Sequence, residues 1–439
     1  MTFEPLERPF GTLDLLYLLW KRRRADVSTL LAELAMPRES FYGAVRRLEQ
    51  LGLVFQHREK GWPVHVYLEL TTKGAETVSA LEPLADFLRR SAVALDEERS
   101  RLTADPSARG RLIEVLTRLY DLYFERGLWD KALACAKDGL HAASAIPDGR
   151  AVAEAHLRLG AVLLRRADPS CEAHLTAALD ALHDLDACRA SDAAYLLASL
   201  REEKRRPDEA ATLLELAIEL GTRVSDPVRV GRAQIGFARI LAKRGMHSEA
   251  YERLQAARVR LEGAGAKEEY PRLYTNLGAT AFRRDPGEAL GWHDRCVDAA
   301  ERLCDVRMIA YGHSNAAGCL IRLGQPARAL DRLEAAREIA KLLQEKRLLV
   351  GIAIQSADAS RAMRRWKAAR TFAEEAVAVA RGAGLQYELA DALYLAGSIE
   401  KRRGESRRAR EFLRESLRLF QELGNRDKQA KVRAELRAA

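Results

Sequence analysis

The sequence predicts an all-α array of stacked helical hairpins, an α-solenoid, preceded by a small α+β domain. The first observation is a period of about 40 residues, here called the alanine beat: the last six of eight recurring alanines are 40, 39, 40, 40 and 40 residues apart. The second is that an apolar helical stretch and a basic or Gly/Pro turn precede each alanine, while a second amphipathic stretch begins just before it. Because a helical hairpin of this length buries its apolar face only against its neighbours, the period predicts a stack. The eight alanines are Ala132, Ala173, Ala210, Ala250, Ala289, Ala329, Ala369 and Ala409.

The third observation is the order of elements before the array. Residues 12–25 have apolar side chains at helical spacing, and a second short helix is expected over 30–34, with Ser28 or Thr29 as its cap. Pro37 is well placed to open a third helix that Gly52 ends. Residues 54–58 and 64–70 alternate as two strands around a turn, and Thr71 or Thr72 caps another helix. Helix, helix–turn–helix, hairpin and helix is the order of a winged helix-turn-helix.

This segment resembles the winged-helix transcription regulators of the MarR/PadR type. The resemblance is carried by LLAELAMPRESFYGAVRRLEQLGLV (residues 30–54), by the hairpin and by LTTKGAETV (residues 70–78). It implies that the helix 38–47 binds in the major groove of double-stranded DNA while the wing 58–65 reaches adjacent phosphates or the minor groove. The implied DNA-binding residues are Arg38, Ser40, Tyr42, Gly43, Arg46 and Arg47 on the helix and Arg58 and Lys60 on the wing.

A protein-binding role for the same segment stays open. Residues 20–60 hold nine cations and five acids, and the recognition helix carries Glu39 and Glu49 among its arginines. A positive field this modest would suit a homodimer, in which two half-sites reinforce each other. Leu84, Leu88, Leu95 and Leu102 follow a heptad-like spacing, but Ser91 and Glu98 interrupt it, so the helix 84–102 either pairs two copies or bridges two domains.

The repeats resemble tetratricopeptide repeats (TPRs) of a long, 40-residue form. The matching stretches are YTNLGATAFRRDPGEAL (274–290), SNAAGCLIRLGQPARAL (314–330) and LYLAGSIEKRRGESRRA (393–409). The resemblance implies a right-handed superhelix whose first helices line the concave wall. We expect a winged domain over 1–90, a connector over 91–110, about eight TPR-like hairpins over 111–424 and a capping helix over 425–439.

The family pattern also places candidate effector-binding residues on that wall. Asn276, Asn315 and Gln355 recur at one repeat position, and their amides could pair with the donors and acceptors of an extended peptide. Arginines beside them would suit an acidic peptide, a free carboxylate or a small anionic effector. The full candidate set is Arg232, Arg239, Arg272, Asn276, Tyr311, Asn315, Arg322, Gln355 and Arg361.

Composition restricts the remaining function classes. The net charge is +9, and the last 39 residues alone hold 13 Lys/Arg against 6 Asp/Glu, so basicity by itself is weak support for DNA binding. No apolar run is long enough for a membrane helix, no secretory signal is apparent, and the six cysteines lack paired spacing, so we expect a cytoplasmic protein that does not bind membranes. No phosphate loop, dinucleotide fingerprint or metal-ligand motif occurs, so neither a cofactor nor catalysis is expected.

The sequence therefore favours a DNA-binding transcription regulator whose repeats hold a peptide, protein or small anionic effector. The alternative is a scaffold or adaptor in which the winged segment and the repeats both bind protein.

Overall fold

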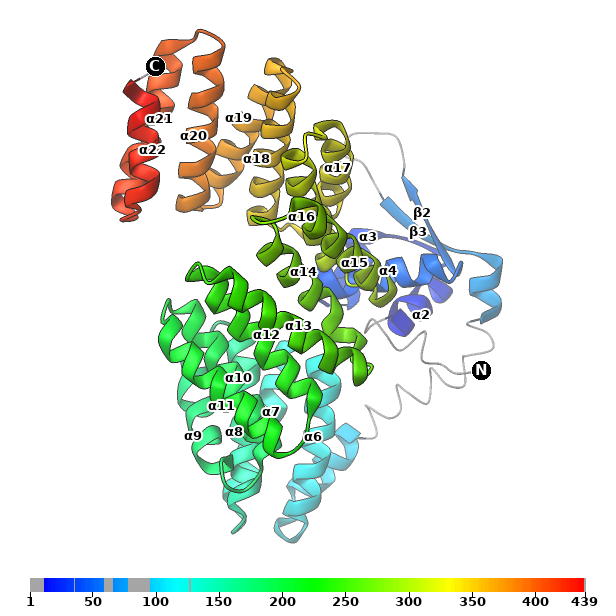
Figure 1. The fold of residues 1–439 in the computed structure, drawn as a ribbon. Coiled ribbons are helices and arrows are strands. Elements are labelled where there is room, and N and C mark those ends of the chain that lie inside the picture. The colour runs from blue at the N-terminus through cyan, green and yellow to red at the C-terminus, as the bar shows by residue number, and fades with distance from the viewer. Residues whose placement is uncertain (1–11, 35, 59–65, 78–94, 126–127, 438–439) are drawn as a thin grey trace. The chain divides into compact units, whose positions relative to one another are not determined.

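A computed structural model describes residues 12–34, 36–58, 66–77, 95–125 and 128–437. The chain forms two compact units, Met1–Glu269 and Tyr270–Ala439, and Figure 1 shows the helices and strands of each. In the described part, no helix combines the length and the apolar character needed to cross a bilayer.

The N-terminal elements form a small α+β assembly. Their order is α2 (Thr12–Arg22), β1 (Arg24–Asp26), α3 (Val27–Leu34), α4 (Arg38–Gln50), β2 (Val54–Arg58) and β3 (Val66–Leu70), with a further helix over 72–77. The three strands form an antiparallel sheet in the order β1-β3-β2, and Leu68 at its centre is fully buried. Leu15, Leu30, Phe41 and Leu48 of the three helices are also fully buried, so the helices and the sheet share one core.

Two local expectations for this segment need correction. The first helix was expected to reach residue 25, but it ends at Arg22, because Arg23 adopts φ 65° and the next three residues pair with β3 as β1. The second helix begins at Val27 rather than near residue 30, and its cap is Asp26, whose carboxylate accepts hydrogen bonds from the main-chain N–H of Ser28 and Thr29 at 2.9 and 3.2 Å. The helix after Pro37 and the strand 54–58 are confirmed.

The array in the first unit consists of four helical hairpins. A helix over 95–103 precedes it, and Leu95 and Leu102 of that helix pack against the core of the first hairpin, so two positions of the heptad-like pattern contact the array. Tyr123 strengthens this contact by donating a 2.9 Å hydrogen bond to Asp96. The elements are η1 (Pro106–Ala108), α6 (Arg109–Glu125), α7 (Trp129–Ser144), α8 (Gly149–Arg165), α9 (Cys171–Leu182), α10 (Ala187–Glu203), α11 (Pro207–Arg223), α12 (Pro227–Lys243), α13 (His247–Gly263) and η2 (Lys267–Glu269).

The second unit continues the pattern with four more hairpins and a final single helix. Its elements are α14 (Tyr270–Ala281), α15 (Pro286–Leu303), α16 (Val306–Arg322), α17 (Pro326–Leu343), α18 (Lys346–Ala362), α19 (Trp366–Gly382), α20 (Gln386–Arg402), α21 (Ser406–Glu422) and α22 (Arg426–Arg437). The first helices α14, α16, α18 and α20 contact one another in succession, as α8, α10 and α12 do in the first unit. Each unit therefore has a row of neighbouring first helices, whose open side we call the first-helix face.

The alanine beat marks where the two helices of a hairpin cross. Seven of the eight alanines are fully buried, the exception being Ala173, which is exposed. Cys171 takes that place instead: it is 1% exposed and lies four residues before buried Leu175, as Ala409 lies four before buried Leu413. A small side chain is needed here because the first helix approaches closely, and a cysteine meets that need as well as an alanine.

Residues with a left-handed backbone conformation follow the ends of many of the helices. The turns that follow α12, α16 and α20 carry a residue in the left-handed region, a glycine in each case, at Gly245, Gly324 and Gly404. In the turn after α16 the main-chain N–H of Gln325 donates to the carbonyl of Leu320 at 2.8 Å, which satisfies a carbonyl that the helix itself leaves open. The turns after α10 and α18 use Arg205 and Arg364 at the same place, so the repeat geometry holds even where glycine is absent.

Candidate functional site

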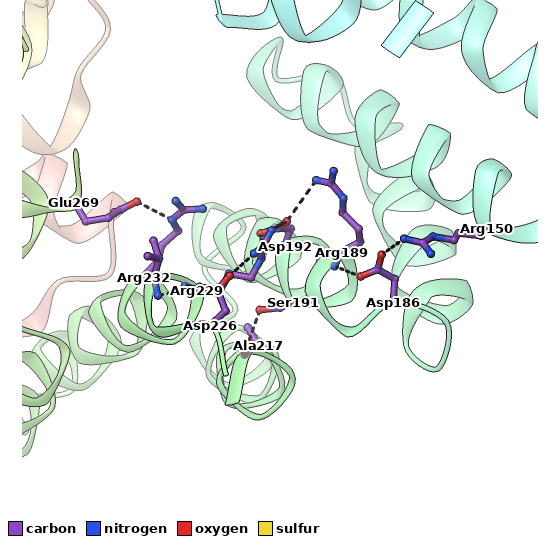
Figure 2. A network of polar contacts seen from close by, with 11 residues as sticks. Arg150, Asp186, Arg189, Ser191, Asp192, Ala217, Asp226, Arg229, Arg232 and Glu269 are labelled. Atoms are coloured by element: carbon purple, nitrogen blue, oxygen red, sulfur yellow. Dashed lines mark hydrogen bonds and ion pairs between the residues drawn. The ribbon is translucent and has the colours of Figure 1, made fainter. Parts of the chain in front are cut away.

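Ion pairs one repeat apart cover the first-helix face of the first unit. Figure 2 shows that Arg229 of α12 reaches back to Asp192 of α10, with both guanidinium-to-carboxylate distances at or below 3.0 Å. Arg229 also pairs with Asp226, the residue that caps its own helix by accepting from the main-chain N–H of Val228 and Arg229. Arg150 of α8 likewise pairs with Asp186 at the start of α10, at 2.6 Å. These contacts connect successive first helices through side chains.

The predicted effector-binding cations of this unit belong to the same system. Arg232 donates to Glu269 at 2.8 Å, and Arg239 and Lys243 both pair with Glu202 (Figure 2 shows the first pair). Burial disfavours the charged form of Glu202, but the hydrogen bonds from the two cations outweigh it and hold its pKa below the ordinary value. An anion bound here would have to compete with these carboxylates, so the face is far less cationic than its sequence suggests.

The three predicted amides lie on α14, α16 and α18 of the second unit, and all are partly exposed. Asn276 donates a 2.8 Å hydrogen bond to the carbonyl of Arg272 in its own helix. Gln355 donates to the hydroxyl of Ser314 at 3.3 Å, and its carbonyl oxygen is buried with no hydrogen-bond partner among the described residues. Within the same part of the chain, the amide of Asn315 has no hydrogen bond. Asn315 is thus the amide that has both exposed surface and hydrogen-bonding groups without a partner in the described chain, whereas the unpaired carbonyl of Gln355 is buried.

The arginines predicted beside these amides are largely committed to the protein itself. Arg361 pairs with Asp358 at 2.8 Å, one turn earlier in its helix. Arg322 donates to the main-chain carbonyl of Arg283 at 3.3 Å and lies 5.1 Å over the ring of Phe282. Arg272 and Tyr311 are exposed and partly exposed, respectively. On the face of the second unit, Asn315 is therefore more available to a ligand than Arg322 and Arg361 are.

In the N-terminal assembly, α4 carries three arginines and two glutamates. Arg38 is exposed, while Ser40, Arg46 and Arg47 are partly exposed. Tyr42 and Gly43, expected on the open face, are instead buried: the tyrosine is only 9% exposed and meets Phe41 edge-on with ring centres 5.3 Å apart. Burial raises the pKa of Tyr42 although the nearby Arg38 opposes this. Lys60 and the side chain of Arg58 lie outside the described residues.

One pairing of histidines was not foreseen from the sequence. His156 of α8 and His174 of α9 bring their Nδ1 atoms to 2.9 Å, and burial lowers the pKa of both imidazoles. The two residues are 18 positions apart on different helices, so only the hairpin crossing reveals their contact. Among the residues described, no group of three or more histidine, cysteine or acidic side chains could hold a metal ion.

Comparison of the sequence with known families and proteins gives no match: no family model fits the chain, and no curated protein resembles it in sequence.

Solved structures with a similar fold do exist. A Rap protein complexed with competence and sporulation factor is 12% identical, with a TM-score of 0.51, and the alignment covers 77% of this chain and 97% of that protein. A Rap conjugation gene regulator of the plasmid pLS20, in complex with a Phr peptide, is 11% identical, with a TM-score of 0.50 and coverages of 77% and 96%. A signal transduction ATPase with numerous domains and a tetratricopeptide repeat sensor, from Pyrococcus horikoshii, is 12% identical, with a TM-score of 0.53 and coverages of 96% and 65%. At these identities the likeness concerns the fold, and the array is a TPR-like α-solenoid.

Proposed function

We propose that this protein is a transcription regulator in which residues 12–77 form a winged helix-turn-helix that binds double-stranded DNA and the repeats bind a peptide effector. The observation that carries the DNA-binding half is the element order α2-β1-α3-α4-β2-β3 with its antiparallel β1-β3-β2 sheet. In such an arrangement α4 is the recognition helix, and Arg38, Arg46 and Arg47 are the side chains within reach of phosphates or base edges. Tyr42 contributes to the core that supports this helix, because it is buried.

The DNA-binding half is tested by measuring affinity for random and selected duplexes at two salt concentrations. Each phosphate contact that an arginine makes releases counterions, so binding should weaken steeply as salt rises. Arg38→Ala combined with Arg46→Ala should lower affinity by about tenfold or more and reduce the salt slope by about 1 to 2.

The matched control is Arg402→Ala combined with Arg410→Ala, which removes two exposed cations at the other end of the chain. The control should bind DNA as the unmodified protein does. If no duplex binds in a salt-sensitive way, or if both double variants lose affinity equally, α4 is not a DNA-recognition helix.

For the effector, the first-helix face of the second unit favours a peptide over a small anion. The partly exposed amide of Asn315 offers a donor and an acceptor that an extended main chain can use, whereas Arg322 and Arg361 are already engaged within the unit. The Rap regulator of plasmid pLS20, which shares this fold, is in complex with a Phr peptide, and that supports a peptide ligand here.

The effector half is tested by Asn315→Ala combined with Gln355→Ala, with capture of co-purified or library peptides as the readout. Asn315 makes no hydrogen bond within the described chain, and Gln355 makes one at 3.3 Å. The free energy of unfolding of the double variant should therefore lie within about 1 kcal/mol of that of the unmodified protein. Peptide capture should fall about tenfold, while Gln421→Ala, an exposed amide on the second helix α21, should leave it unchanged. Undiminished capture in the double variant would refute the amide site.

A scaffold that uses both modules to bind protein is the second candidate. It is favoured by the acids Glu39 and Glu49 on α4, since carboxylates on this helix repel a phosphate backbone but can pair with cations of a protein partner. This candidate would be favoured if the variant with Arg38→Ala and Arg46→Ala no longer bound a protein partner while its DNA binding stayed unchanged.

A further inference from the structure

A hollow of about 570 Å³ lies where the turn after α18 leads into α19. Its lining residues are Arg365, Trp366, Lys367, Ala368, Thr371 and Phe372. Trp366 and Phe372 are partly exposed aromatic rings, and Arg365 and Lys367 are exposed cations beside them. None of these residues belongs to the first-helix face or to α4, so the hollow is separate from both sites described above.

The cations of this hollow differ from most others in the array. Arginines of the neighbouring helices are paired, as Arg361 is with Asp358, Arg370 with Glu374 and Arg337 with Glu375. By contrast, Arg364, Arg365 and Lys367 have no carboxylate within salt-bridge distance anywhere in the described chain. Three exposed cations without carboxylate partners, within four successive residues, give this turn a local positive field that the protein does not neutralise itself.

Trp366 lies three residues before Ala369, at the first position of its helix. The equivalent residues of α11, α15 and α17 are Pro207, Pro286 and Pro326, whereas α7 has a second tryptophan, Trp129, whose ring meets Phe124 edge-on. Proline suits that position because its fixed φ fits the first turn. Trp366 has no ring contact and no hydrogen bond from its indole N–H to any described residue, so a large apolar surface and a donor are presented at the hollow.

We propose that this hollow is a docking site for an acidic segment of a partner protein that carries a bulky apolar side chain. The apolar anchor packs between Trp366 and Phe372, and the acids beside it face Arg364, Arg365 and Lys367. Charge complementarity selects this occupant: the cations Arg365 and Lys367 line the hollow, Arg364 adjoins it in sequence, and a partner with acids alone would leave the ring of Trp366 unused. The proposal does not depend on DNA binding or on an effector at the first-helix face.

The test measures by fluorescence anisotropy how tightly the whole protein binds a labelled ten-residue peptide. The peptide consists of Asp and Glu around a central Phe-Leu pair. Arg365→Glu combined with Lys367→Glu should weaken binding by at least about tenfold. Trp366→Pro should weaken it similarly and still fold, because Arg365 has ψ 67° and the residue before Pro207 has ψ 69°. The matched control, Arg402→Glu combined with Arg410→Glu, makes the same change in net charge outside the hollow and should alter affinity by less than about threefold.

Further outcomes separate the proposal from its rivals. Replacing Phe-Leu by Ser-Ser in the peptide should raise its Kd above about 1 mM. A peptide with Lys in place of the acids should not bind. The proposal is overturned if the acidic anchored peptide does not bind, if the two charge-reversal variants lose affinity equally, or if the Ser-Ser peptide binds as well. It is also overturned if a DNA duplex, and not the peptide, requires Trp366.

Discussion

At the scale of single residues, burial at one repeat position lowers the pKa of a histidine, His293, far below its ordinary value. His293 occupies the place of Leu175 and Leu413 in other hairpins, directly against the glycine of the preceding helix, Gly278. It is 3% exposed, its Nδ1 atom has no partner in the described chain, and burial lowers its pKa to about 4. Between about pH 4 and pH 6.5, the unfolded state therefore binds more protons at this site than the folded state does.

This shift predicts a pH dependence of stability. The stabilising effect is present above about pH 6.5 and is lost as the pH falls toward 4, because protons then favour the unfolded chain. Between about pH 7.5 and pH 5 we expect His293 alone to remove about 2 kcal/mol from the free energy of unfolding. His293→Leu should abolish that part of the loss, as measured by urea unfolding at both pH values. Replacing the exposed His141 by Gln should leave the loss in place, and an unchanged loss in His293→Leu would contradict the assignment.

At the scale of elements, the sequence could predict what each helix encodes for itself but not what a distant segment imposes. The helical hairpins and the strand 54–58 were predictable because apolar spacing, turn residues and caps lie within the element. β1 was not, because a three-residue strand exists only through its pairing with β3, in which Arg24 lies opposite Glu69. The same reason limits the site: a helical wheel places Arg239 on an open face but cannot show Glu202, one repeat away, beside it.

The hairpin crossing gives an element-scale prediction with a built-in control. A Cβ added to Gly160 in α8 would lie 2.7 Å from Leu175 Cγ and 3.1 Å from the Leu175 main-chain nitrogen, so α9 would have to move. Gly160→Ala should therefore destabilise the protein by about 1 to 3 kcal/mol. Gly291, inside α15 and exposed, has no atom within 4 Å of an added Cβ, so Gly291→Ala should stabilise by about 0.5 to 1 kcal/mol. Thermal and urea unfolding measure both changes, and shifts of the same sign would disprove close contact at the crossing.

At the scale of the whole molecule, the repeats interact with their neighbours through two kinds of contact. Buried small residues hold the two helices of a hairpin together, and carboxylate–arginine pairs spaced by 36 to 38 residues connect one hairpin to the next. Such an array is held together mainly by nearest-neighbour terms. The architecture was predictable because a 40-residue period implies it, whereas the division into units at Glu269 and Tyr270 coincides only with a one-residue shortening of the alanine interval, from Ala250 to Ala289.

Nearest-neighbour stabilisation makes the effect of one ion pair local. Arg229→Gln removes both hydrogen bonds to Asp192, which is 23% exposed, and leaves that carboxylate with only the 3.9 Å contact to Arg189 among its described ion pairs. The cost should be about 1 to 3 kcal/mol, and it should fall on the contact between α10 and α12. Amide hydrogen exchange should therefore accelerate in these two helices, while α16, α18 and α20 of the other unit exchange at unchanged rates. Arg418→Gln, which removes an exposed pair within α21 at 3.8 Å, serves as the control and should change neither region. A uniform acceleration along the chain would mean that the array unfolds as one cooperative body, and the ion pairs would then stabilise the whole protein instead of one junction.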